Sequence, residues 1–407
     1  MPSLSCLAWS IFAASLFSLT VADLCHAKDY PLTVTGGEST IVECPVSIEL
    51  PKGIGANEHL SLKRPGQENG ILIQRDGSDR AIFILDEPLG ARESRDYVLG
   101  TFAGKVDEAT FVECHQQDDV LRVTSHGREV FTYHIGISEP PVGVDKLFRR
   151  SGHIHPVKTP SGKVVTEEFP ADHLHQHAIF SAWVKTEFEG RPVDFWNQHK
   201  GQGTVRHAKL ISSESGTVFA EFTVALEHVD LSAPEGPKVA LNETWNVRVY
   251  GTPSGHLFDL KSTQRTASDS PLSVQEYHYG GMAARGAGEW LGQPEANFLT
   301  SEGKNRVDGN HSRPDWVSMH GLVDGVPCGL AVFSSPRNFR SPQPVRLHPS
   351  KPYFVFSPCV LGDFQIAPGE EAVSEYRYFA YDGPPDLNRL DQIFHGYTST
   401  IDVTLDE

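Results

Sequence analysis

Three histidines alternate with other residues in the stretch DHLHQHAIFSAW, residues 172–183. They are His173, His175 and His177. Imidazole is the side chain that transfers protons near neutral pH, and it is also a common metal ligand. Seven of the 19 histidines of the chain lie between residues 153 and 207. This concentration indicates a functional site.

One hypothesis for these histidines is a divalent metal site. If the segment is extended, alternate Cβ atoms on one face lie about 7 Å apart. Two such imidazoles cannot reach one zinc ion at about 2.0–2.1 Å without help from another segment. The sequence HIH at residues 153–155 offers that help, and Glu168 or Asp172 would complete or orient the set. The expected metal ligands are His153, His155, His173 and His175.

The leading hypothesis is acid and base chemistry on a carbohydrate at a concave, histidine-rich site. Aromatic planes beside amide, carboxylate and guanidinium groups suit a polyhydroxylated ligand. We expect His173 or His175 to act as the general acid and Glu276 as the base. The expected ligand-binding residues are His155, His177, Asp172, Trp196, His278 and Arg285. The alternative is a noncatalytic glycan-binding or cell-surface module, in which the histidines only form hydrogen bonds.

Other classes of function lack their sequence signals. The chain has no GxSxG, no phosphate-binding loop, no dinucleotide fingerprint and no HExxH. Its formal net charge of −17 opposes binding to nucleic acid. Hydride transfer and phosphoryl transfer from a nucleotide are therefore disfavoured.

The elements that position these residues are predicted to be strands. In GTVFAEFTVALEHV, residues 216–229, apolar and polar residues alternate with period two, as in a half-buried strand. Two hairpins are expected around residues 125–127 and 251–255, and one helix at residues 386–397. The pattern predicts an all-β protein: a small N-terminal β-sandwich at residues 28–117 and a large antiparallel unit at residues 118–407.

The first 27 residues resemble a secretory signal peptide. An apolar run at residues 6–22 is followed by small residues, with Ala22 and Ala27 as candidate cleavage positions. We therefore expect an exported protein, periplasmic or extracellular, with no membrane insertion after cleavage. Four cysteines would remain, which allows two disulfides, Cys44 with Cys114 and Cys328 with Cys359, or four buried free thiols.

Several motifs resemble a secreted bacterial family labelled PmoA-like, or methane oxygenase PmoA. They are the His-Pro at residues 155–156, the TPSG at 159–162 and the DHLH at 172–175, within a resemblance that covers roughly residues 130–385. Many members have glycine where this chain has Ala178. The resemblance implies a galactose-mutarotase-like supersandwich for the large unit. Membrane methane oxidation is excluded, because no later segment has 18 uninterrupted apolar residues.

The signal-like start generates the first prediction. Mass spectrometry of the exported protein should give an N-terminus near Asp23 or Lys28, because cleavage follows a small residue. An exported protein that still carries Met1 would contradict it.

Overall fold

The computed structural model describes residues 26–56, 58–67, 69–102 and 111–405. All but the last two residues of the predicted signal segment therefore lie outside the described part of the chain. Strands account for 50% of the residues and helices for 7%, which confirms the predicted all-β class. Among the described residues, no helix has both the length and the apolar character needed to cross a membrane.

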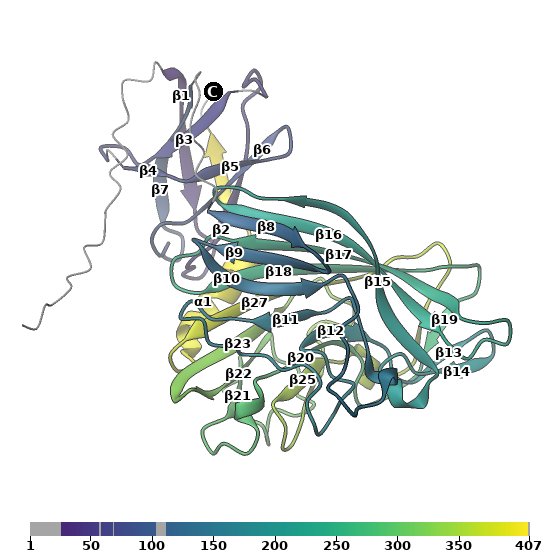
Figure 1. Ribbon diagram of the computed structural model, residues 1–407. Coiled ribbons are helices and arrows are strands. Elements are labelled where there is room, and N and C mark those ends of the chain that lie inside the picture. Colours follow the sequence, from purple (N-terminus) through teal and green to yellow (C-terminus); the bar gives the residue numbers. More distant parts are fainter. Residues whose placement is uncertain (1–25, 57, 68, 103–110, 406–407) are drawn as a thin grey trace, which may run out of the picture.

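The larger unit is built on two antiparallel sheets of eight strands each, as predicted (Figure 1). The first has the order β24 (Val345–Leu347), β25 (Tyr353–Phe356), β20 (Gly281–Arg285), β12 (Ile179–Ala182), β11 (Ile154–Val157), β10 (Arg128–His134), β9 (Val120–Ser125) and β8 (Val112–Gln117). The second has the order β15 (Gly203–Glu214), β16 (Phe219–Asp230), β17 (Lys238–Tyr250), β18 (His256–Thr266), β27 (Ala372–Asp382), β23 (Val326–Ser334), β22 (Trp316–Val323) and β21 (Asn297–Thr300).

Alternation of apolar side chains fixes which face of each strand enters the core. In β16, Phe222, Val224 and Leu226 are buried, whereas Thr223 and Ala225 are partly exposed. Fully burying one such apolar side chain contributes about 1.5–3 kcal/mol. The apolar cluster built in this way draws residues from both large sheets, so the two sheets share one core.

A further sheet of four short strands belongs to the same unit. Its order is β14 (Arg191–Val193), β13 (Thr186–Phe188), β19 (Leu272–Val274) and β26 (Phe364–Ile366). Figure 1 places β13, β14 and β19 together at the end of the large unit that is remote from the small one. The connection from β14 to β15 carries His199, and the connection from β19 to β20 carries Tyr277, His278 and Tyr279.

The predicted helix is present as α1 (Leu387–Thr398). The Asp386 side chain caps it by accepting a hydrogen bond from the Arg389 backbone N–H, which satisfies a donor that the first turn leaves free. Leu390 and Ile393 are buried in an apolar cluster that also contains Trp316. This packing explains why the helical spacing of the apolar residues was readable in the sequence.

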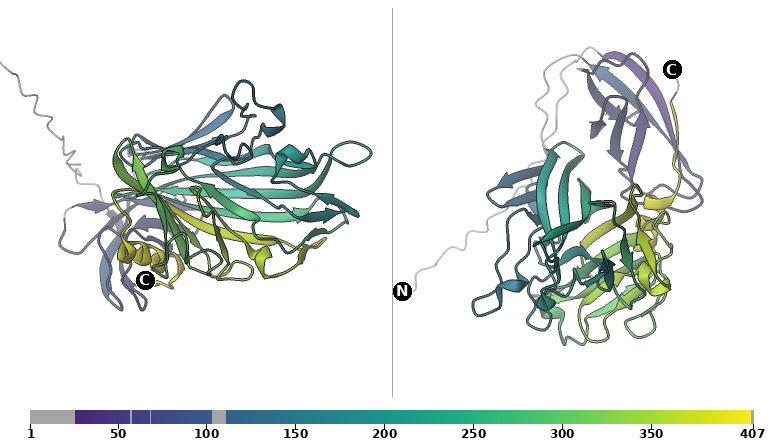
Figure 2. Two further views of the ribbon diagram at one scale, coloured as in Figure 1. Left: turned by 90° about the horizontal axis from the view of Figure 1, so that it is seen from below. Right: turned by 90° about the vertical axis from the view of Figure 1, so that its right-hand side faces the viewer.

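The smaller unit is a sandwich of a five-stranded and a three-stranded sheet. The first has the order β28 (Asp402–Leu405), β1 (His26–Thr35), β7 (Ser94–Phe102), β3 (His59–Lys63) and β4 (Gly70–Ile71). The second has the order β2 (Pro45–Glu49), β6 (Arg80–Ile84) and β5 (Ile73–Asp76). The small unit has its own apolar core and lies at one end of the large unit (Figure 2).

Two strands do not follow the domain boundary that the sequence suggests at residue 117. Strand β8 precedes residue 118 but pairs with β9 of the large unit. Strand β28 comes from the end of the described chain and pairs with β1 of the small unit. The small sandwich therefore uses both ends of the described chain. Gln74 also joins the units, because its side-chain oxygen accepts hydrogen bonds from the backbone N–H groups of Val218 and Phe219.

The cysteine pairing expected as one alternative is wrong. All four described cysteines are buried free thiols. Cys44 donates a hydrogen bond to the Gly396 carbonyl at 3.0 Å, and Cys359 approaches the Tyr277 carbonyl at 3.5 Å. A buried free cysteine packs as a small hydrophobic residue with a weak S–H donor. Burial raises the pKa of the Cys44 thiol to about 11, so it is protonated at neutral pH.

The pairing of β28 with β1 generates a prediction about the small unit. Deleting residues 400–407 removes a strand that pairs at Leu32, Thr33, Val34 and Thr35. Amide hydrogens of β1 should then exchange at least about tenfold faster, equivalent to a loss of about 1.4 kcal/mol of local stability. Hydrogen exchange measured by mass spectrometry tests this, with peptides of β16 as the internal control. Unchanged protection of β1 would contradict it.

Candidate functional site

The alternating histidines lie on a loop, so the extended strand expected from the sequence is wrong. Residues 167–177, here called the histidine loop, leave and rejoin the sheet through an antiparallel bridge between Glu168 and His177. The backbone N–H of His173 donates to the Pro170 carbonyl, and that of Gln176 donates to the His173 carbonyl, each at 2.9 Å. These bonds close tight turns, which extended backbone cannot contain.

The histidine loop has a base in the protein interior and a tip at the surface. His177, at the base, is fully buried, whereas His173 and His175, at the tip, are partly exposed. Ala178, directly after the loop, has φ of 54°, in the left-handed region that favours glycine. The glycine that the sequence resemblance leads us to expect at this position would relieve that strain.

Four imidazoles meet at the tip and form what we call the surface histidine group. The ring centroids of His173 and His175 are 5.6 Å apart, those of His173 and His348 5.5 Å, and those of His175 and His199 5.9 Å. His348 follows β24 and His199 lies in the short 3-10 helix η2 (Gln198–Lys200). Three separate segments of the chain therefore supply the group.

The His348 ring has a defined tautomer. Its Nδ1 accepts hydrogen bonds from the backbone N–H groups of Ser350 at 3.2 Å and Lys351 at 3.1 Å. Because Nδ1 is an acceptor, the proton of the neutral ring lies on Nε2. His348 therefore keeps an N–H group that can donate to a ligand.

Arg285 holds the histidine loop in place. This residue of β20 is fully buried, and its guanidinium donates to Glu167, Asp172 and Gln176, all of the loop. Lys351 also contacts Asp172, at 3.0 Å. Arg285 and Asp172 were expected to contact a ligand, but their charged groups are engaged with each other. They therefore position the loop instead.

Burial and neighbouring charges lower the pKa of two imidazoles of the surface histidine group and shift that of Asp172. Burial, aided by His173 and His199, lowers the pKa of His175 to about 3. Burial, aided by His173, lowers the pKa of His348 to about 4. Burial alone would raise the pKa of Asp172, but Lys351 and Arg285 outweigh it, and the net shift is downward. At neutral pH the His175 and His348 imidazoles are therefore neutral, and they lie near an ionised, ion-paired carboxylate.

Aromatic side chains continue the surface histidine group along the same end of the sandwich. We call Tyr277, His278 and Tyr279 the aromatic rim, because their ring centroids lie 4.2–5.0 Å apart. Trp196 links the rim to the histidines: its ring contacts Tyr279 at 5.2 Å and Tyr353 at 6.1 Å, and Tyr353 contacts His348 at 5.8 Å. Trp196 was expected to touch a ligand, but it is fully buried and supports the rim from below.

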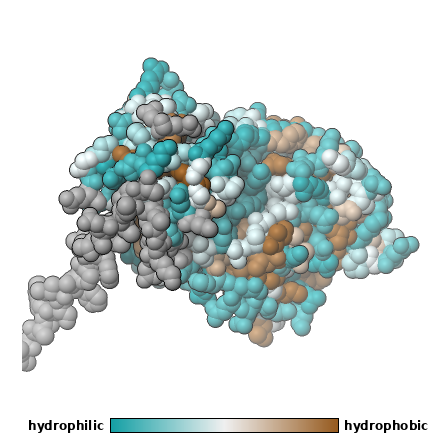
Figure 3. Space-filling model, turned by 90° about the horizontal axis from the view of Figure 1, so that it is seen from above, coloured by the Kyte–Doolittle hydropathy of each residue, from teal (hydrophilic) through white to brown (hydrophobic). Residues whose placement is uncertain are grey.

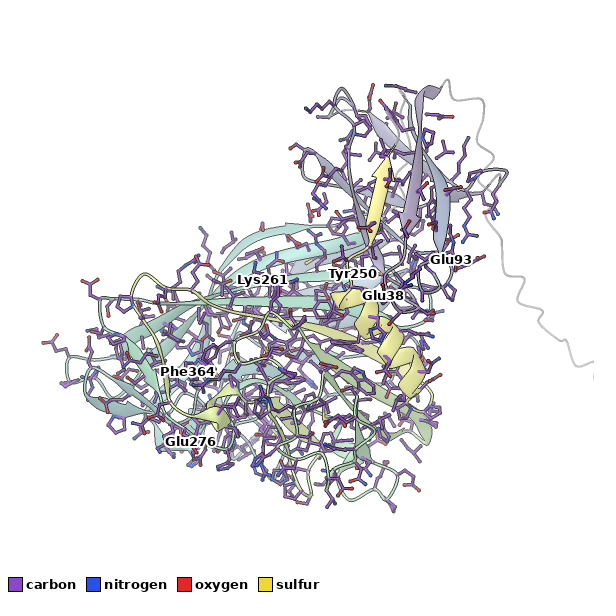
Figure 4. The ribbon with its side chains drawn as sticks, turned by 180° about the vertical axis from the view of Figure 1, so that it is seen from behind. Glu38, Glu93, Tyr250, Lys261, Glu276 and Phe364 are labelled. Carbon is purple, nitrogen blue, oxygen red and sulfur yellow. The ribbon has the colours of Figure 1, made fainter. Side chains whose placement is uncertain are left out.

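Glu276 lies beside the rim, apart from the histidines that it was expected to assist. It is exposed, and its backbone N–H donates to the Asp363 carboxylate. Figure 4 shows it at the edge of the large unit, far from the small unit that carries Glu38 and Glu93. Within the described residues, no hydrogen bond or ion pair joins the Glu276 carboxylate to His173 or His175. The structure therefore does not assemble the expected acid and base pair.

A second group of imidazoles lies at the base of the loop. We call His134, His153, His177 and Glu168 the buried histidine group. The rings of His134 and His153 stack at 4.5 Å, and those of His153 and His177 are 5.3 Å apart. Glu168 Oε1 lies 2.6 Å from His153 Nε2 and 3.8 Å from His177 Nδ1. One potential ligand atom each from His134, His153 and Glu168 lie within 4.8 Å of one another.

The four histidines expected to form one metal shell are divided between separate environments. His153 belongs to the buried histidine group, and His173 and His175 belong to the surface histidine group. His155 Nδ1 pairs with the Thr166 hydroxyl at 3.0 Å. His155 and His177, both expected to bind a ligand, are thus engaged within the protein.

Two histidines of these groups, His134 and His348, were not expected from the sequence. His134 is the last residue of β10, and its backbone pairs with that of His153. His348 lies 173 positions after His175 in a proline-rich loop, and only the pairing of β24, β25, β20 and β12 brings it to the loop tip. Hairpin pairing of two histidine-bearing strands was a readable signal for His134, whereas nothing local marked His348.

One cavity between the two large sheets is too small for a sugar. The cavity leaves about 20 Å³ for the centres of water molecules, room for about one water. It is lined by Ser181, Trp183, Ser262, Gln264, Gly281, Met282, Pro358, Ser374 and Tyr376. A sugar ring does not fit into this cavity.

Comparison with protein families identifies the large unit. Residues 120–395 match the family of unknown function DUF6807, and the chain belongs to that family. The PmoA-like resemblance gains no support from this match, because the matching family carries a different description. A comparison with curated protein sequences returns no match.

Similar solved structures come from bacterial carbohydrate-related proteins. An alpha-mannosidase from Enterococcus faecalis V583 has 10% identity and a TM-score of 0.40, covering 94% of this chain and 46% of that one. A glycosyl hydrolase family 38 protein from Enterococcus faecalis gives 10% and 0.35, covering 94% and 48%. The chain thus spans about half the length of these two. A galactose mutarotase related enzyme from Lactobacillus acidophilus gives 8% and 0.22, covering 68% and 99%. At such low scores these likenesses assign no function.

The ion pairs of the histidine loop generate a prediction with a defined pH dependence. Asp172→Asn should lower the free energy of unfolding by about 2 kcal/mol at pH 7, because a buried guanidinium loses a charged acceptor. The folded pKa of Asp172 lies below its ordinary value, so its contribution is complete above that value, about 3.9, and is lost as pH falls further. Urea unfolding of both proteins should therefore show a constant difference from pH 7 to about 5, which shrinks below about pH 4.

Asp324→Asn is the matched control. Asp324 also pairs with a lysine, but its side chain is 71% exposed, so the effect should stay below about 0.5 kcal/mol. An Asp172→Asn protein as stable as the wild type at pH 7 would contradict the conclusion that the pair of Arg285 and Asp172 stabilises the histidine loop.

Proposed function

We propose that this member of the DUF6807 family is an exported protein that binds a carbohydrate on the surface histidine group and the aromatic rim. The observation that carries the proposal is the continuity of rings from His199 through His175, His173 and His348 to the rim. Buried Tyr353 and Trp196 connect and support these exposed rings. Export is supported only by the signal-like start of the sequence.

The chemistry of this surface favours a neutral polyhydroxylated ligand. Aromatic planes pack against the C–H faces of sugars, and polar groups at their edges bond hydroxyls. Tyr277 and Tyr279 supply such planes with their hydroxyl groups, and His348 supplies an N–H donor. The nearby charges of Asp172 and Arg285 are paired with each other, so they leave little net attraction for a charged ligand. Figure 3 shows one face of the molecule, seen from above, on which polar and apolar residues are mixed.

A second candidate function is proton transfer to the bound sugar by His173. Asp172 Oδ2 lies 3.3 Å from His173 Nδ1, the arrangement in which a carboxylate orients a catalytic imidazole. That contact lacks hydrogen-bond geometry, because His173 Nδ1 has no hydrogen-bond partner. Binding therefore ranks ahead of catalysis, and catalysis would require the His173 ring to rotate when the ligand binds.

A glycan array, followed by calorimetry on the glycans that bind, tests the proposal. Tyr277→Ala and His348→Ala should each weaken binding by about tenfold, because each removes a contact with the ligand. His115→Ala is the matched control, since His115 is exposed on β8, at the opposite edge of the sheet from β24 and β25. Equal binding by all four proteins, or no binding across the array, would contradict the proposal.

The same glycans distinguish catalysis from binding alone. Mass spectrometry and NMR of each glycan after incubation with the wild-type protein report any chemical change. A product that His173→Gln fails to form, while still binding the glycan, would assign proton transfer to His173. A glycan that binds and stays unchanged would identify a noncatalytic binding module.

A further inference from the structure

We propose that the buried histidine group is a binding site for a divalent first-row transition metal, with Glu168, His153 and His177 as ligands. The site is separate from the surface histidine group, and its ligand set differs from the one expected from sequence. Two buried acceptor atoms, His177 Nδ1 and Glu168 Oε1, face each other there without a hydrogen-bond partner.

The tautomer of His177 follows from its neighbours. The Gln198 side-chain N–H donates to the Arg149 carbonyl at 3.0 Å, which fixes the orientation of the Gln198 amide. Its oxygen therefore faces His177 Nε2, at 2.9 Å. An amide oxygen only accepts, so His177 Nε2 carries the proton. Nδ1 is left with a lone pair, as in the histidine ligands of metal sites, whose other ring nitrogen donates to a fixed acceptor.

That lone pair points to a region already occupied by a carboxylate. His177 Nδ1 lies 3.8 Å from Glu168 Oε1, and neither atom has a hydrogen-bond partner. His177 is fully buried, and the Glu168 side chain is 13% exposed. Two acceptors that face each other away from water repel, and a buried polar atom without a partner is costly. A cation bound between the two atoms removes their repulsion and gives each of them a partner.

His153 supplies a third unsatisfied atom beside the same carboxylate oxygen. Its Nε2 is 2.6 Å from Glu168 Oε1, yet the pair lacks hydrogen-bond geometry, and both ring nitrogens of this fully buried residue are without a partner. His134 lies beside it but is already engaged: its Nε2 pairs with the His155 carbonyl and its Nδ1 with the Ser138 hydroxyl. We therefore assign His134 to the wall of the site.

The chemistry of the ligand set indicates the class of metal. Two imidazoles and one carboxylate suit zinc and other first-row divalent ions, whereas calcium and magnesium prefer oxygen ligands. Three protein ligands leave a coordination position open. The partly exposed Glu168 gives the ion a route from solvent.

Metal content of the full chain, purified without an affinity tag or chelator, is the first test. After addition of excess Zn²⁺ and removal of unbound ion, mass spectrometry of the metal should find close to one zinc per chain. Co²⁺ should give visible absorption bands of a site with nitrogen and oxygen ligands. Wild-type protein that retains neither ion would overturn the proposal, and would indicate that a water alone bridges these atoms.

Variants then locate the ion. Glu168→Gln and His177→Phe should each weaken Zn²⁺ binding by at least about a hundredfold, and Gln198→Leu by about tenfold to a hundredfold, because Gln198 sets the His177 tautomer. The matched control is the double variant His173→Ala with His348→Ala, which should retain the metal. Loss of metal in this control alone would place the ion at the surface histidine group and overturn the proposal. X-ray absorption of the Zn²⁺-loaded wild type needs no variant, and a first shell without imidazole would also overturn it.

Discussion

The arrangement of both histidine groups depends on the buried guanidinium group of Arg285. Arg285 extends from β20, in the middle of the first large sheet, and bonds Glu167, Asp172 and Gln176 of the histidine loop. A buried guanidinium is tolerated only when carboxylates and carbonyl groups satisfy it, so the loop must adopt the turns that bring these acceptors together. Those turns separate His177, which goes inward, from His173 and His175, which stay at the surface. The chain thus places two kinds of imidazole environment within five residues.

Much of the fold was readable from the sequence because the responsible forces are local. Alternation in β16, turn residues between β9 and β10, and helical spacing in α1 each reflect burial of one face. The pairing of β28 with β1 was not readable, because four residues at the far end of the chain carry no signal of their partner. The cysteines were ambiguous for a similar reason, since sequence separation does not report distance in space.

The sequence predicted which residue types the candidate site contains, but not how they are arranged in space. The alternating histidines satisfied a strand pattern, yet Pro170 and the acceptors of Arg285 impose turns, a case of tertiary contacts overriding local periodicity. His348 reaches the site only because the strand that precedes it pairs with the neighbouring strand of the sheet. Trp196 was expected to contact the ligand, but it is buried beneath the rings that would contact the ligand. Residue types therefore indicated a candidate region, whereas which of these residues meet in space required the structure.

The central claim is that the surface histidine group and the aromatic rim together form a carbohydrate-binding surface. Its most direct test is a crystal structure of the protein soaked with a glycan that it binds in solution. We expect a sugar ring packed against Tyr277 or Tyr279 of the rim, with a hydroxyl within hydrogen-bond distance of His348 Nε2. A glycan bound on the small sandwich, or on the large unit away from these rings, would contradict it.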